Sequence, residues 1–128
     1  MRIEKRIGAR LREERRKRGW SQEMLGEQVS RYLDHPWSIQ TVSTAENGGR
    51  DFAARDLLAL ALVLGVPIAA FYRPTIEASE EITTPSGHAV SESAMRRVYG
   101  HPNMEAHRIA HEMEKLATDV RLLGEGEA

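Results

Sequence analysis

The sequence predicts an all-α fold, with five short helices in residues 1–73 followed by a linker and a helical C-terminal segment. Apolar residues recur three or four positions apart, a spacing that places them on one face of a helix. Serines stand where helices need an N-cap, and glycines or prolines stand at the joints between the apolar runs. Because the joints are short, the five helices are expected to pack into one compact domain.

Each of the five helices has a local reason to begin or end. Ile7 and Leu11 lie four apart on one face of the first helix, and Ser21 and Ser38 can cap the second and third. The fourth helix is nearly all apolar, as expected of a helix buried on most sides, and Pro67 begins the fifth in the first turn, where proline is tolerated. The expected ranges are residues 3–18, 22–33, 39–47, 53–64 and 68–72.

Beyond this domain, residues 74–90 are rich in Pro, Ser, Thr and Glu and are expected to form a linker. The C-terminal segment, residues 91–128, is expected to contain a short helix over 91–99 and a longer one over 103–123. Apolar residues of the longer helix form a seam of two heptads: Ile109, Met113, Leu116, Val120 and Leu123. An isolated helix of this length is marginal in water, so the seam needs a partner. A homodimer is expected, and docking on the same chain or on another protein are the alternatives.

The composition excludes several classes of protein. The 128 residues include 18 Lys and Arg, 19 Asp and Glu, and no Cys, so disulfides, thiolate zinc sites and a cysteine nucleophile are excluded. The first residues are charged, and no secretion signal is expected. The longest apolar run, residues 57–72, is shorter than the roughly 20 residues of a membrane span. A cytoplasmic protein without membrane contact is the expectation.

Charge is distributed unevenly along the chain. Residues 1–73 carry 13 basic and 9 acidic side chains, a net +4, whereas residues 74–128 carry 5 and 10, a net −5. The basic part favours an anionic partner, and the acidic part favours regulation or association with a protein.

Residues 38–48 have the pattern of a helix that can enter the major groove of DNA. Val42 and Ala45 lie three apart and can face the preceding helix, which leaves the polar residues pointing outward. Those outward residues are Gln40, Thr41, Ser43 and Thr44. A glutamine can form two hydrogen bonds with adenine, and Ser or Thr can reach base edges or phosphates. Taken alone, the pattern also fits an ordinary solvated helix face.

Several short motifs carry a stronger signal through their order and spacing: IGARL at 7–11, GWSQ at 19–22, VSTAENG at 42–48 and LLALALVLGVP at 57–67. Together they resemble the lambda/434-repressor-like, or Cro/C1-type (XRE), helix-turn-helix DNA-binding domains. The resemblance covers roughly residues 6–73. It implies a five-helix domain with residues 39–47 as the recognition helix.

The resemblance also implies which positions contact DNA. The glutamine at the start of the second helix would bond a phosphate, the recognition helix would read base edges, chiefly through Ile39, Gln40 and Thr44, and the turn after it would hold the sugar-phosphate chain. The full set is Gln22, Ser38, Ile39, Gln40, Thr41, Ser43, Thr44, Asn47 and Arg50. An ion pair between Arg15 and Glu46 would tie the first helix to the recognition helix and fix its orientation.

Two features depart from the family pattern. Ile39 stands where the family often has a polar residue, and it could contact a thymine methyl group but not form a hydrogen bond. The connection over residues 30–37 is several residues longer than the usual tight turn, and Trp37 in it is expected to pack. Within the base-rich first helix, Arg16 and Arg18 are further candidates for phosphate contact.

These observations predict a sequence-specific double-stranded DNA-binding regulator of transcription that acts as a repressor without a cofactor. The alternative is an antitoxin or anti-regulator that acts through its acidic C-terminal helices, and a ligand sensor is a third, weaker interpretation. No catalytic set of residues is recognisable, so an enzyme is not predicted. His107, His111 and Glu114 have a spacing that could hold zinc, but an exposed polar face is favoured and no metal is predicted.

Overall fold

The computed structural model describes residues 1–100 and 111–121, and these are mostly helical. The helices are α1 (Ile3–Lys17), α2 (Gln22–Ser30), α3 (Ile39–Glu46), α4 (Ala54–Leu64), the 3-10 helix η1 (Ile68–Tyr72) and α5 (Glu92–Tyr99). Strands β1 (Ile82–Thr83) and β2 (Ala89–Val90) lie between η1 and α5, and residues 111–121 are also helical. The predicted helical class is therefore confirmed, with a small sheet added to it.

Local side chains explain where the helices begin and end. The hydroxyl groups of Ser21, Ser38 and Ser91 each accept a hydrogen bond from a backbone N–H three residues later, at 3.1 Å, and so cap α2, α3 and α5. At α4, the Asp56 carboxylate accepts a hydrogen bond from the Ala53 N–H at 2.8 Å. All three serine caps lie where the sequence predicts the corresponding helix to start.

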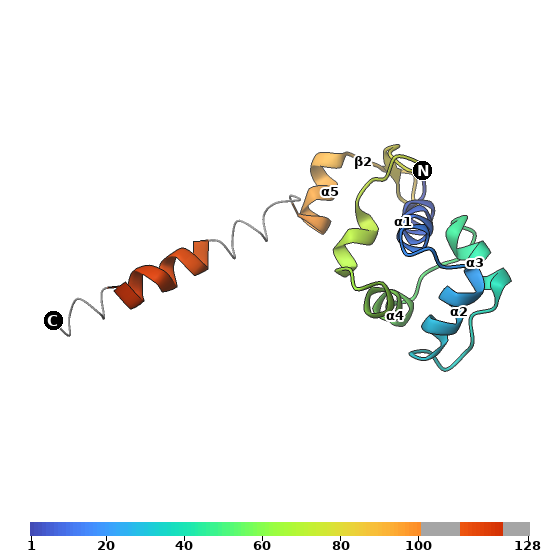
Figure 1. Cartoon of the computed structure of the whole chain (residues 1–128). Helices are drawn as coiled ribbons and strands as arrows, with labels where there is room; N and C mark the ends of the chain where they lie inside the picture. The colour runs from blue at the N-terminus through green and yellow to red at the C-terminus, as the bar shows by residue number, and fades with distance from the viewer. Residues whose placement is uncertain (101–110, 122–128) are drawn as a thin grey trace.

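One apolar core joins α1, α2, α3, α4 and η1. Its fully buried members include Leu11, Leu25, Val42, Leu60 and Phe71, one from each element. In Figure 1, α1 lies at the centre, with α2 and α3 on one side and α5 on the other. The packing therefore leaves the outer face of α3 on the side of the domain away from α5.

Two predicted helices differ in detail from the structure. The second was expected to reach residue 33, but α2 ends at Ser30 because Arg31, Tyr32 and Leu33 donate to carbonyls three residues back, which tightens the chain into turns. The fifth has the expected range, residues 68–72, but is a 3-10 helix.

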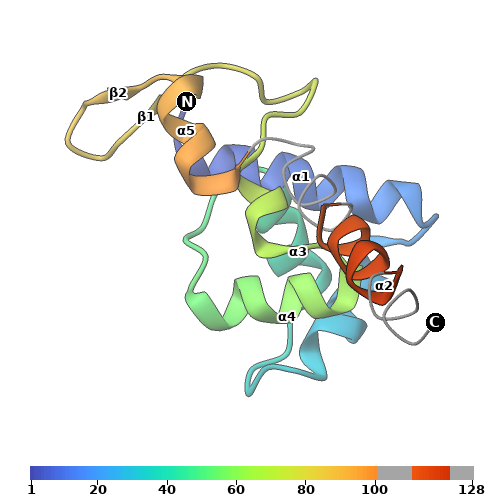
Figure 2. The ribbon, with the colours of Figure 1, turned by 90° about the vertical axis from the view of Figure 1, so that its left-hand side faces the viewer.

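Residues 74–90, which were expected to form a linker, fold against the helices. Strands β1 and β2 pair antiparallel in this segment, with Ile82 opposite Val90, and both Ala78 and Ile82 are buried. Ile82 packs with Met95 and Tyr99 of α5 in a second, smaller apolar cluster. Figure 2 shows the hairpin beside α5, at the end of the molecule where the N-terminus lies.

A buried arginine joins α5 to α1. The Arg6 side chain is completely buried and donates hydrogen bonds to the carbonyls of Tyr72 and Glu80 and to the carboxylate of Glu92. The other Glu92 oxygen accepts a hydrogen bond from the Tyr99 hydroxyl at 2.8 Å. The hairpin and α5 are thus fixed to the five-helix unit by hydrogen bonds as well as by apolar packing.

Within residues 111–121, the apolar side chains of the predicted seam face solvent. Met113, Leu116 and Val120 are 65%, 63% and 66% exposed. The seam residues Ile109 and Leu123, and the range 103–110 of the predicted helix, lie outside the described residues. The described part of this helix therefore presents an unpartnered apolar stripe.

Candidate nucleic-acid interface

The amphipathic pattern of α3 separates a buried face from an outer one. Val42, Ala45 and Glu46 are buried, and Thr41, Ser43 and Thr44 are partly buried. Gln40 and Asn47 are exposed, and Ile39 is 52% exposed although its side chain is apolar. The outer face of this helix is therefore polar, with one apolar side chain at its start.

An ion pair holds α3 against α1. Arg15 Nε lies 3.0 Å from each carboxylate oxygen of Glu46, and Arg15 Nη2 lies 2.8 Å from Oε1. The remaining Arg15 nitrogen, Nη1, donates to the Trp20 carbonyl at 2.8 Å, so the turn before α2 is tied to the same group. The Glu46 side chain is fully buried, so this geometry is shielded from water. The structure thus contains the contact expected between these two residues.

A glycine permits the close approach of the same two helices. A Cβ atom at Gly8 would lie 2.3 Å from the Ala45 carbonyl oxygen and 2.7 Å from that of Glu46. Any larger side chain would push α3 away from α1. The position of the recognition candidate is therefore fixed by backbone contact as well as by charge.

Three hydroxyl groups on α3 already have partners. Ser38 Oγ accepts from the Thr41 N–H and lies 3.0 Å from Thr41 Oγ1, while Thr44 Oγ1 donates to the Gln40 carbonyl at 2.9 Å. A hydroxyl group that donates within its own helix can still accept a hydrogen bond from outside. Ser43 is partly buried on the same outer side.

The end of α3 is joined to the basic face of α1. Asn47, which caps the helix, accepts a hydrogen bond at Oδ1 from Arg12 Nη2. Arg12 also lies 3.8 Å from Glu46, three residues before Arg15 on the side of α1 that faces α3. Arg12 was not among the predicted contact residues, although its i, i+3 spacing from Arg15 places the two on one face of α1.

The remaining predicted contact residues flank α3. Gln22 is partly buried in the first turn of α2, next to the cap at Ser21. Arg50 follows α3 and is 32% exposed. Gln40, Thr41, Thr44, Arg50 and Asp51 line one open hollow of about 440 Å³. The structure therefore brings Arg50 to the outer face of α3, whereas Gln22 stands at the start of the neighbouring helix.

The two arginines predicted as further phosphate contacts have partners within the protein. Arg18 donates to the Leu64 carbonyl and to Glu14, at 2.9 Å from its carboxylate. Burial raises the pKa of Glu14, but hydrogen bonds from Arg18 and Lys17 outweigh it, so this pKa is below its ordinary value. Arg18 is therefore engaged in joining α1 to the end of α4.

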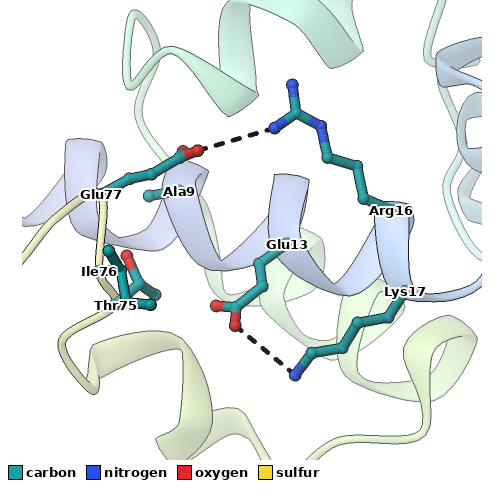
Figure 3. Close-up of a pocket in the computed structure, with 7 residues that line it drawn as sticks. All are labelled: Ala9, Glu13, Arg16, Lys17, Thr75, Ile76 and Glu77. Atoms are coloured by element: carbon teal, nitrogen blue, oxygen red, sulfur yellow. Dashed lines mark ion pairs between the residues drawn. The ribbon is translucent and has the colours of Figure 1, made fainter.

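Arg16 borders a hollow of about 470 Å³ between α1 and residues 75–77 (Figure 3). Residues that line the hollow form two ion pairs, Arg16 with Glu77 and Lys17 with Glu13, each at 3.6 Å. Ile76 beside them is fully exposed. The hollow has the volume of a small-molecule pocket, but its charged groups already pair with one another.

Within residues 1–100 and 111–121, no three His, Cys, Asp or Glu side chains are grouped as a metal ion would require. His111 and Glu114 are exposed on the helix over 111–121, whereas His107 lies outside the described residues. None of the helices in the described ranges has the length and apolar character needed to cross a membrane.

Comparison with known proteins agrees with this geometry. The family model of a helix-turn-helix domain matches residues 6–71, slightly more than half of the chain, and these residues include most of α1, all of α2, α3 and α4, and nearly all of η1. No curated protein and no solved structure matches the chain significantly. This chain belongs to the helix-turn-helix domain family.

Proposed function

We propose that this protein is a sequence-specific regulator of transcription that inserts α3 into the major groove of double-stranded DNA and represses the promoter it occupies. The observation that carries this proposal is the outer face of α3, which is polar and exposed while its inner face is pinned to α1 by Arg15, Glu46 and Gly8. A fixed helix with short polar side chains suits the groove, because base edges demand precise placement of donors and acceptors.

The residues divide into base-reading and backbone-binding groups. Gln40 is exposed in the first turn of α3 and would form two hydrogen bonds with an adenine, while Ile39 would contact a thymine methyl group. Thr44 would accept a hydrogen bond from a base amino group, because its own proton is used within the helix. Thr41 and Ser43 flank these contacts.

The backbone-binding group surrounds α3. Gln22, at the positive end of α2, would bond a phosphate, and Ser38 would do so at the start of α3. Asn47 would contact the chain at the other end of α3, next to the guanidinium group of Arg12. These contacts set affinity and register but do not select a sequence. Arg50, which lines the hollow beside Gln40 and Thr44, would also contact DNA but is not one of these backbone-binding residues.

Selection of bound duplexes from a random library tests this proposal. The full chain is expected to enrich one motif, and Gln40→Ala and Thr44→Ala are each expected to relax one or two positions of it, at about 1–3 kcal/mol per lost contact. Glu27→Gln, an exposed change on the outer side of α2, is the matched control. Unchanged selection by both α3 variants would show that this helix does not read DNA.

A second candidate function is that of an antitoxin or anti-regulator acting through residues 91–128. The net −5 of residues 74–128 and the exposed Met113, Leu116 and Val120 favour it. A pull-down from native cells separates the two candidates. A stoichiometric small basic protein would favour the second, and recovery of this chain with DNA but without such a protein would favour the first.

A further inference from the structure

Arg50, four residues after the end of α3, is held on two sides. Its guanidinium carbon lies 4.7 Å from the centroid of the Trp37 ring, within the range of a cation–π contact. Its Nη2 atom lies 3.5 Å from the Asp56 carboxylate, and its Nε donates to the Asp51 carbonyl at 3.2 Å. An arginine held in this way has a fixed fork of donors, unlike one on a free surface.

The tryptophan beneath it is itself fixed. Trp37 is 6% exposed and belongs to the main core, and its backbone N–H donates to Ser30 Oγ at 2.8 Å. Ser30 Oγ in turn donates to the Gly26 carbonyl at 2.6 Å. A Cβ atom at Gly26 would lie 2.4 Å from the Trp37 carbonyl oxygen, so glycine is needed for the connection to pack this closely on α2. The long α2–α3 connection is therefore fixed to α2 at Trp37, near the start of α3.

The acidic partner is equally constrained. The Asp56 side chain is 6% exposed, and its carboxylate is positioned by the hydrogen bond from the Ala53 N–H that begins α4. Asp56 thus supports Arg50 from the start of α4, as Trp37 does from the connection before α3.

Arg50 lines the same hollow as the base-reading candidates. Arg50 lines the open hollow along the outer face of α3 together with Gln40 and Thr44, and it also lines a second hollow of about 140 Å³ with Trp37 and Asp56. The exposed Asp51 lies at the first hollow as well. A phosphate placed there would be repelled by the charge of Asp51, and the charge of Arg50 that could attract it is already balanced by Asp56.

We infer that Arg50 reads a base pair and does not neutralise a phosphate. Trp37 and Asp56 act as positioning residues that hold its guanidinium group beside Gln40 and Thr44. The chemistry that suits it is the O6 and N7 acceptor pair of a guanine, to which an arginine fork forms two parallel hydrogen bonds. This inference rests on the proposed function, since it assumes that α3 lies in the major groove.

Duplex selection with the full chain, followed by affinity measurements over a range of salt concentrations, tests the inference. Arg50→Ala and Arg50→Lys are expected to lose a guanine preference at one position of the enriched motif and to weaken binding to that duplex by roughly 5- to 150-fold. Both variants should keep the salt dependence of the native chain to within less than one unit of slope. Arg31→Ala, which removes an exposed arginine from the same connection, should keep the guanine preference.

Two positioning variants extend the test. Trp37→Leu and Ser30→Ala are expected to relax the same guanine position without changing the salt slope, because they loosen Arg50 and leave its charge in place. Thermal unfolding of each variant establishes that it is folded, and Ser30→Ala, which removes one anchor of the connection and leaves the core ring intact, serves where Trp37→Leu is unfolded. Retained guanine preference in the folded variants would remove the positioning role.

The remaining outcomes distinguish the inference from the function beneath it. If Arg50→Ala weakens binding to all duplexes alike and lowers the salt slope by about one, Arg50 contacts a phosphate and the inference is wrong. If Gln40→Ala changes selection in that same experiment, the proposed function still stands. If the native chain enriches no motif, the proposed function fails and the inference fails with it.

Discussion

Arg15 donates hydrogen bonds to the Glu46 carboxylate from Nε and Nη2, and Nε lies 3.0 Å from both carboxylate oxygens. The Glu46 side chain is fully buried and that of Arg15 is 12% exposed, so the pair lies in the interior between α1 and α3. A buried pair of this kind adds little net stability but is costly to break from one side, because the remaining charge is left without compensation. Its main effect is to fix the direction in which the outer face of α3 points.

Removing one partner should therefore be more damaging than removing both. Arg15→Ala is expected to lower the free energy of unfolding by about 3 kcal/mol, near the lower end for buried pairs because Arg12 remains 3.8 Å from the carboxylate. The double variant Arg15→Met, Glu46→Met should cost less, since it leaves no buried charge. Urea unfolding of the three proteins measures this, and a cost below about 1 kcal/mol for Arg15→Ala would mean that the pair behaves as an exposed one.

The contact between Arg6 and Glu92 predicts a dependence of stability on pH. Burial raises the pKa of the Glu92 carboxyl group, but hydrogen bonds from Arg6 and Tyr99 and the charge of Arg6 outweigh it, so the pKa is below its ordinary value of 4.5. A lowered pKa in the folded state contributes stability that is present above pH 4.5 and is lost as the pH falls through the folded value. Attachment of α5 should therefore weaken in acid.

The alkaline limit of the same contact has the opposite sign. Burial, and the hydrogen bond to Glu92, raise the pKa of the Tyr99 hydroxyl above its ordinary value of 10.0, so its contribution is present below pH 10.0 and is lost as the pH rises through the folded value.

Denaturant unfolding between pH 3 and 7 tests the acid limit, which is set by Glu92. Glu92→Gln should reduce the loss of stability in acid relative to the native chain, whereas the exposed control Glu27→Gln should leave it unchanged.

How far the sequence could predict this structure depends on the range of each interaction. Ser21, Ser38 and Ser91 act on backbone groups three residues away, and for that reason the starts of α2, α3 and α5 could be placed from local pattern. The order of the motifs that make up the family resemblance also placed Arg15 opposite Glu46, 31 positions along the chain.

The parts that could not be predicted depend on distant residues. Arg6 and Glu92 are 86 positions apart, and no local pattern marks a pair at that separation. Strands of two residues are too short to show an alternation of apolar and polar side chains, so the segment 74–90 resembled a linker. The contact of Arg50 with Trp37 is likewise a product of tertiary packing, although burial of that tryptophan was expected and is confirmed.

Glu77 should weaken DNA binding, because it neutralises the basic face of α1 beside α3. It lies 3.6 Å from Arg16 and 3.9 Å from Arg12, the residue that also donates to Asn47. Glu77→Gln is expected to tighten binding to every duplex by about 1.4- to fivefold, the effect of roughly 0.2–1 kcal/mol typical of an exposed ion pair, and to steepen the salt dependence.

A matched control for this change lies in the same segment. Glu81 is exposed, and its backbone carbonyl accepts a hydrogen bond from the N-terminal amino group. Glu81→Gln removes the same charge from the chain without freeing Arg12 or Arg16, so it should have a smaller effect. Equal effects of the two variants would show that net charge, and not the contact with Arg12 and Arg16, is responsible.

The exposed stripe of residues 111–121 should join two copies of the chain. We propose a homodimer in which Met113, Leu116 and Val120 pack against the same residues of the second copy, so that each copy reads one half-site about one helical turn, roughly 34 Å, from the other. Leu116→Glu should give a monomer by sedimentation equilibrium, and its affinity for a duplex with two half-sites should fall by about 100-fold or more. Because Leu116 is 63% exposed, the change should leave the thermal unfolding of the helix-turn-helix domain unaltered. Thr118→Glu, the control, adds the same charge to the same helix away from the stripe and should stay dimeric. A native chain that is monomeric in solution while it binds a duplex with two half-sites would contradict the proposed homodimer.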